Sequence, residues 1–111
     1  MIREYYDILE KNKEFFDRSF EIAGQIAKKA REIFDDCEVY IAGSFAREEH
    51  KLSSDLDILI ESRDIPKKIE FEWFSKVAKT LTDDHRVNIY LINREKFREV
   101  EKMCSPRIRI L

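Results

Sequence analysis

The sequence predicts a single α/β (α+β) domain in which helices flank a small mixed sheet. Segments whose apolar residues keep helical spacing alternate with short β-rich runs, a pattern typical of a sheet covered by helices. A length of 111 residues suits one domain spanning residues 1–111. With 43% hydrophobic residues, including eight Phe and four Tyr, the chain can bury a core without disulfides or structural metals.

The charge balance and the N-terminal sequence narrow the functional classes. The 21 basic and 23 acidic side chains nearly cancel, so no field of one sign draws nucleic acid or an anionic membrane to the whole surface. We therefore expect no direct nucleic-acid partner and no membrane association. The chain has no charged-then-apolar leader, no long apolar run and no Cys-x-x-Cys motif, which favours a cytoplasmic protein.

The first third of the chain is amphipathic. From Ile2 to Phe34 apolar residues recur mostly at steps of three and four, which predicts helix. Asn12 and Gly24 interrupt the pattern weakly, so the segment is either one long helix or a short helix followed by a long one. Its aromatic-rich start is either ordinary core or a surface for a partner.

Two strands are predicted on either side of a short turn or helix. Cys37 to Ala42 is a β-rich run that ends at Gly43, and Asp55 to Glu61 is a second one. Between them, Ser44 to Lys51 has room for a turn or two of helix capped by its first hydroxyl.

The second half of the chain repeats the alternation. Apolar residues from Ile69 to Leu81 keep helical spacing, and Pro66 stands where that helix can start. Val87 to Ile92 predicts a third strand and Arg94 to Met103 a short helix. Arg107 to Leu111 alternates Arg with Ile or Leu, as an edge strand does.

A glycine-serine pair ends the first predicted strand. Gly43 lets the backbone turn sharply and lets a bulky ligand approach the main chain. Ser44 adds a hydroxyl and opens a helix whose free N–H groups favour phosphate oxygens. By itself the pair is more typical of a simple tight turn.

Two carboxylates begin the second predicted strand. Asp55 and Asp57 point to one face because side chains two apart in a strand share a face. Two like charges side by side are unfavourable unless a cation neutralises them, and oxygen ligands suit Mg²⁺ carrying a nucleotide's phosphates. The alternative is a solvent-exposed pair at the end of a strand.

The glycine-serine pair and the carboxylates are separated by ten residues, and together they form a more specific motif. It consists of Gly43-Ser44-Phe45-Ala46-Arg47 followed by Ser54-Asp55-Leu56-Asp57-Ile58-Leu59-Ile60. Over Tyr40 to Glu61 the chain resembles the minimal nucleotidyltransferases of the DNA polymerase beta superfamily. The closest likeness is to the small antitoxin partners of HEPN toxins.

This resemblance implies a polymerase beta palm-like nucleotidyltransferase fold. It implies two Mg²⁺ ions and attack by a hydroxyl on the α-phosphate of a nucleoside triphosphate, with release of pyrophosphate. Gly43 and Ser44 would hold the triphosphate, with Arg47 bringing positive charge, and Asp55 and Asp57 would hold the metals. Lys51 and Arg86 are further candidates for phosphate contacts, although exposed cations in so charged a chain are ordinarily solvated.

Two positions depart from the family pattern. Glu48 stands where the family has Gly and adds a negative charge beside an anion site. Asn88 stands on the third strand where the family has a third catalytic Asp. Its amide oxygen can bind a metal, but the amide accepts no proton at neutral pH and contributes no charge. We expect slow or absent catalysis as a result.

Other titratable groups near the third strand are weaker candidates. Asp83 and Asp84 lie just upstream and are either substitutes for the missing carboxylate or ordinary turn residues. His50 and His85 are possible bases, but neither shows metal-ligand spacing.

The resemblance implies an ATP-using enzyme that modifies a tyrosine hydroxyl on a helical HEPN toxin and so acts as the antitoxin. The first alternative is a nucleotidyltransferase-fold binding module that neutralises its partner by contact, which Asn88 and Glu48 favour. The second alternative is a small transferase acting on an antibiotic or metabolite.

Overall fold

The computed structural model describes residues 2–43, 55–104 and 106–111. The expected short helix over Ser44 to Lys51 lies outside the described residues. The elements are α1 (Ile2–Ile33), β1 (Cys37–Ala42), β2 (Leu56–Ser62), α3 (Phe71–Leu81), β3 (Val87–Asn93), α4 (Arg94–Val100), a 3₁₀ turn η1 (Glu101–Cys104) and β4 (Ile108–Ile110).

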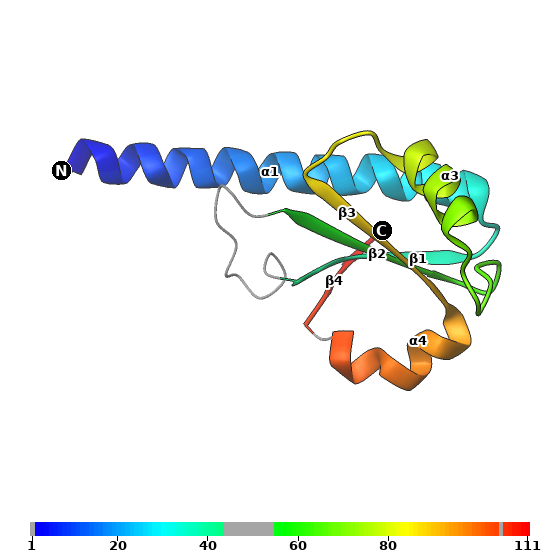
Figure 1. The fold of residues 1–111 in the computed structure, drawn as a ribbon. Coiled ribbons are helices and arrows are strands. Elements are labelled where there is room, and N and C mark those ends of the chain that lie inside the picture. Colours follow the sequence, from blue (N-terminus) through cyan, green and yellow to red (C-terminus); the bar gives the residue numbers. More distant parts are fainter. Residues whose placement is uncertain (1, 44–54, 105) are drawn as a thin grey trace.

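The four strands form one mixed sheet in the order β3-β2-β1-β4. β1 runs antiparallel to both β2 and β4, and β2 runs parallel to β3. Figure 1 shows α1 and α3 on one side of this sheet and α4 on the other. The predicted α/β (α+β) class, a small mixed sheet flanked by helices, is confirmed.

The core lies between the sheet and the α1–α3 layer. Three alanines on α1, Ala23, Ala27 and Ala30, are fully buried and let the helix approach the strands closely. The strand side of this core consists of alternate apolar residues of the inner strands: Val39, Ile41, Ile58 and Ile60. The side chains between these core residues in sequence point to the opposite face. Asp57 on β2 therefore points to the α4 side of the sheet.

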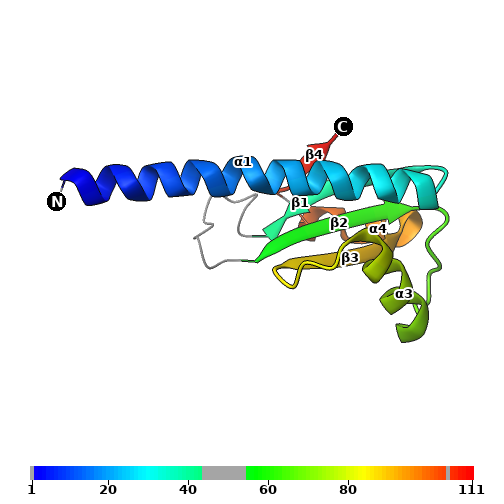
Figure 2. The ribbon, with the colours of Figure 1, turned by 90° about the horizontal axis from the view of Figure 1, so that it is seen from above.

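The first helix is a single one, which decides between the two arrangements left open by the sequence. α1 continues through Asn12 and Gly24 without a break. Its N-terminal half extends beyond the sheet in both views (Figures 1 and 2), and its C-terminal half packs Ala23, Ile26, Ala27 and Ala30 into the core. Among the described residues, no helix is both long enough and apolar enough to cross a bilayer.

Two predicted helix boundaries are wrong. α3 begins at Phe71 and not at Pro66, because tertiary contacts hold the intervening segment in an irregular conformation. Ile65 is fully buried, its N–H donates to the Ser62 carbonyl, and its own carbonyl accepts from Asn93 Nδ2 at 2.7 Å. The last helix, expected to reach Met103, leaves α-helical geometry after Val100 and tightens into η1.

Candidate active site

Asp57 lies between two residues that pair with it on the neighbouring strands. It is opposite Ala42 in the antiparallel β1–β2 pairing and opposite Asn88 in the parallel β2–β3 pairing. Asn88 Nδ2 donates to Asp57 Oδ1 at 3.1 Å and to Asp55 Oδ2 at 3.4 Å. Asp55, Asp57 and Asn88, which the sequence singled out, therefore form one cluster on the α4 side of the sheet.

Gly43 packs its backbone directly against this cluster. Its φ of +66° lies in the left-handed region that favours glycine. A Cβ added at this position would lie 2.1 Å from Asp57 Oδ2, far inside van der Waals contact. The bend after β1 and the carboxylate of Asp57 therefore share one rim, which requires a residue without a side chain at position 43.

Ser44, Arg47, Glu48, His50 and Lys51, which the sequence also singled out, lie outside the described residues.

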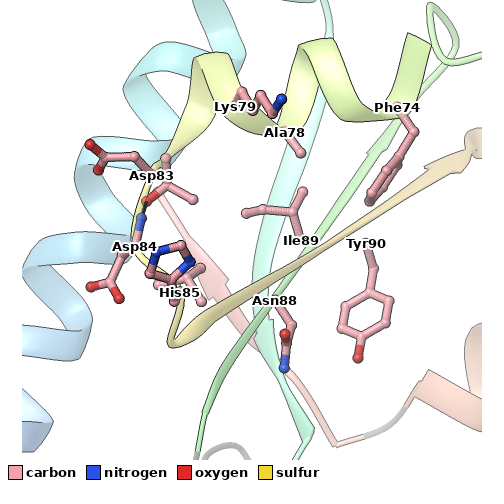
Figure 3. Close-up of a pocket in the computed structure, with 11 residues that line it drawn as sticks. Phe74, Ala78, Lys79, Asp83, Asp84, His85, Asn88, Ile89 and Tyr90 are labelled. Atoms are coloured by element: carbon pink, nitrogen blue, oxygen red, sulfur yellow. Dashed lines mark hydrogen bonds between the residues drawn. The ribbon is translucent and has the colours of Figure 1, made fainter. Parts of the chain in front are cut away.

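The loop before β3 holds the other acidic candidates. Figure 3 shows Asp83 and Asp84 turned away from Asn88. Asp84 Oδ1 accepts the Arg86 N–H at 2.9 Å, and the Asp84 carbonyl accepts the Val87 N–H at 3.2 Å. Asp84 is thus a turn residue that shapes the entry to β3.

The whole chain, residues 1–111, matches the family model described as poly(A) RNA polymerase, mitochondrial-like, central palm domain. The chain belongs to this palm-domain family. Its fold is similar to that of a proposed nucleotidyltransferase from Sulfolobus solfataricus, with a TM-score of 0.72 and 22% identity over 89% of this chain and 85% of that one. A second proposed nucleotidyltransferase gives a TM-score of 0.55 and 18% identity over 78% of this chain and 94% of that one. No curated protein matches significantly.

These similarities establish a nucleotidyltransferase-type palm fold. Asp57 lies on β2 next to the bend that ends β1, and Asp55 lies directly before β2.

Tyr90 belongs to the same rim, although sequence reasoning did not select it. Its side chain is 51% exposed and follows Asn88 by two positions on β3, so both point to one face. The negative charge of Asp57, then partial burial, then the charge of Asp55 raise the pKa of the Tyr90 hydroxyl above its ordinary value. The spacing of two along a predicted strand is the signal that finds Tyr90 from sequence.

The donor set of the palm domain suits a hard divalent cation. Asp55 and Asp57 supply carboxylate oxygens, which Mg²⁺ prefers, and Asn88 offers an amide oxygen once its side chain turns over. Within the described part of the chain, no group of three His, Cys, Asp or Glu side chains is placed to hold a metal. Among the described residues, the cluster therefore offers two carboxylates and one amide to a cation.

A groove opens beside the cluster, between α3 and β3. Its volume is about 810 Å³, within the range of small-molecule sites. Figure 3 shows Phe74 and Ala78 of α3 facing Ile89 of β3, whereas Tyr90 and Asn88 point to the other side of β3. Asn88 lines the groove and also touches both carboxylates, so the groove leads directly to the candidate site.

Proposed function

We propose that this palm domain transfers a nucleoside monophosphate, AMP from ATP, to an acceptor hydroxyl. The observation that carries the proposal is the contact of Gly43 and Asn88 with the same carboxylate, Asp57, from two neighbouring strands. The family and the fold support nucleotidyl transfer in general. A bare backbone bend beside paired carboxylates is what a triphosphate bound through a divalent cation requires.

Asp55 and Asp57 would hold Mg²⁺, which offsets the negative charge of the phosphates during transfer. Gly43 leaves room for the triphosphate to approach the main chain. The acceptor oxygen then bonds to the α-phosphorus while the bond from that phosphorus to the bridging oxygen breaks, and pyrophosphate leaves. Asn88 accepts no proton, so the proton of the acceptor passes to water and transfer is slow.

We extend the proposal to the acceptor. It is a tyrosine hydroxyl of a HEPN-type toxin, and the palm domain acts as the antitoxin in the cytoplasm. The support is the resemblance of the segment from Gly43 to Asp57 to the antitoxin partners of HEPN toxins. The near balance of charge favours a protein acceptor over RNA, which the description of the family would otherwise suggest.

The test is incubation with α-labelled ATP, Mg²⁺ and either the HEPN partner or an oligoadenylate. We expect label on the partner, faster with Asn88→Asp and absent with Asp55→Ala plus Asp57→Ala. Transfer to neither acceptor, by the wild type or by Asn88→Asp, ends the enzymatic interpretation. Label on the oligoadenylate alone replaces the protein acceptor with RNA.

The hydrogen bonds of Asn88 favour a second candidate, a binding module that neutralises its partner by contact. Its amide already satisfies both carboxylates without a metal. This candidate predicts that Asp55→Ala plus Asp57→Ala leaves complex formation and neutralisation intact. Loss of neutralisation in a variant that still forms the complex contradicts it.

A further inference from the structure

The two edges of the sheet are built differently. β4 is three residues long, carries Arg109, which pairs with Glu38, and follows Pro106. Short length, charge and proline are the features by which proteins protect an edge strand from pairing. β3, at the other edge, has seven residues with the sequence Val-Asn-Ile-Tyr-Leu-Ile-Asn, without charge or proline. Within the described sheet, the long unprotected edge is therefore the one beside the candidate site.

The outer side of β3 presents regularly spaced backbone groups. The Leu56 N–H donates to the Arg86 carbonyl at 2.8 Å, which sets the phase of the parallel β2–β3 ladder. Since alternate residues of a strand face opposite neighbours, Ile89 and Leu91 turn their N–H and C=O groups away from β2. An extended polypeptide is the ligand whose own backbone matches such a row.

The groove provides places for side chains on both sides of an added strand. Phe74 and Ala78 line it from α3, and Tyr90 and Asn88 line it from the face that carries the carboxylates. Alternate side chains of an added strand would therefore enter the α3 side and the Asp57 side in turn.

The direction of the proposed transfer also points to this edge, and this step rests on the proposed function. Attacking and leaving oxygens lie roughly in line in phosphoryl transfer. Gly43 follows β1 on one side of Asp57, and Asn88 on β3 lies on the other. With the triphosphate over Gly43, pyrophosphate departs on the β1 side, so the acceptor approaches from the β3 side.

We infer that the edge of β3 binds an extended polypeptide segment of the acceptor protein as an added strand, and presents a tyrosine of that segment to Asp55 and Asp57. The added strand lies two strand spacings from β2, about 10 Å. A tyrosine hydroxyl lies several ångströms from its own backbone, whereas a serine hydroxyl stays close to it, so of the two the tyrosine comes nearer to the carboxylates. The strand edge thereby selects for a phenolic acceptor.

The test measures backbone amide exchange by NMR on the full chain. The probe is the peptide acetyl-Thr-Val-Tyr-Val-Thr-amide at low millimolar concentration. The matched control is the same peptide methylated on alternate backbone nitrogens, which keeps the side chains and blocks strand pairing. We expect the peptide to slow exchange of the Ile89 and Leu91 amides about tenfold. The β4 amides and the methylated control should show no change.

Three results would overturn the inference. One is unchanged exchange at Ile89 and Leu91 with the peptide, and another is equal slowing by the methylated control. The third is slowing by an oligoadenylate, or by raised protein concentration without peptide, since the occupant is then nucleic acid or a second copy. The same measurement on Asp55→Ala plus Asp57→Ala separates the two proposals. Strand pairing should survive there even though Mg²⁺-ATP binding is lost, and failure of Mg²⁺-ATP binding in the wild type concerns the proposed function alone.

Discussion

Asn88 donates its side-chain N–H to Asp57 across the parallel pairing of β3 with β2, at 3.1 Å. An amide therefore occupies the position at which a third carboxylate would crowd the other two. The amide stabilises the carboxylate pair when no cation is present, because a donor replaces a like charge.

Asn88→Asp should lower the stability of the metal-free protein and make its stability depend on a bound cation. In EDTA we expect the free energy of unfolding to fall by about 1–3 kcal/mol, because hydrogen bonds to Asp55 and Asp57 are lost and like charges meet. Mg²⁺ should then raise the melting temperature more than in the wild type. Thermal unfolding with and without Mg²⁺ checks both, with Asn88→Ala as the variant that removes the bonds without adding charge. A variant indifferent to Mg²⁺ would show that these carboxylates hold no cation.

The two glycines should respond in opposite directions to alanine. Gly43→Ala places a Cβ 2.1 Å from Asp57 Oδ2. It also requires alanine to adopt a left-handed backbone conformation, which costs about 1–2 kcal/mol of stability, so this variant should be destabilised. Gly24 is exposed within α1 with nothing within 4 Å of an added Cβ, so Gly24→Ala should stabilise by about 0.5–1 kcal/mol. Urea unfolding measures both. Equal effects would contradict the conformation assigned to Gly43.

The free energy of unfolding at alkaline pH should depend on the negative charge of Asp57, through its effect on the Tyr90 hydroxyl. The folded chain holds the Tyr90 proton more tightly than the unfolded chain, because Asp57 raises the Tyr90 pKa from 10.0. The free energy of unfolding should therefore fall as pH rises past 10.0 and stop falling once the raised pKa is passed.

Asp57→Asn should reduce this alkaline loss, and absorbance titration should show a lower pKa for Tyr90. Tyr40, whose pKa is raised mainly by burial, is present in both proteins and does not affect the comparison. Tyr90→Phe identifies the titration that belongs to Tyr90. An unchanged alkaline loss in Asp57→Asn would be incompatible with the proximity of these two side chains.

The start of α4 depends on a buried ion pair. Arg94 Nε contacts Glu61 Oε2 at 3.0 Å, with side chains only 12% and 6% exposed, and Arg94 also binds Asp36. Arg94→Met leaves Glu61 buried without its partner and should cost about 3–5 kcal/mol, part of which Glu61→Gln restores in the double variant.

An exposed ion pair provides the control. Lys67 pairs with Glu95 at side-chain exposures of 60% and 68%, so Lys67→Met should lower stability much less than Arg94→Met does, because water screens an exposed pair. Guanidinium unfolding of the wild type, Arg94→Met, the double variant with Glu61→Gln and Lys67→Met measures these differences. A loss in Arg94→Met no larger than in Lys67→Met would show that the Arg94 pair contributes little.

The amino-acid sequence by itself determined the strands and one half of the site. The runs that became β1, β2 and β3 are short and β-rich, and a period of two already placed Asp55 and Asp57 on one face. These features depend on neighbours in sequence, which is why local spacing predicts them.

The tertiary structure decided what depends on contacts between distant segments. The parallel β2–β3 register places Asn88 and Tyr90 near the carboxylates. Ile65 is buried in the irregular segment before α3, which begins only at Phe71. The tertiary structure also left β3 as a long open edge beside the groove. Register, burial and edge position are set by the packing of the whole sheet, so no local pattern of residues specifies them.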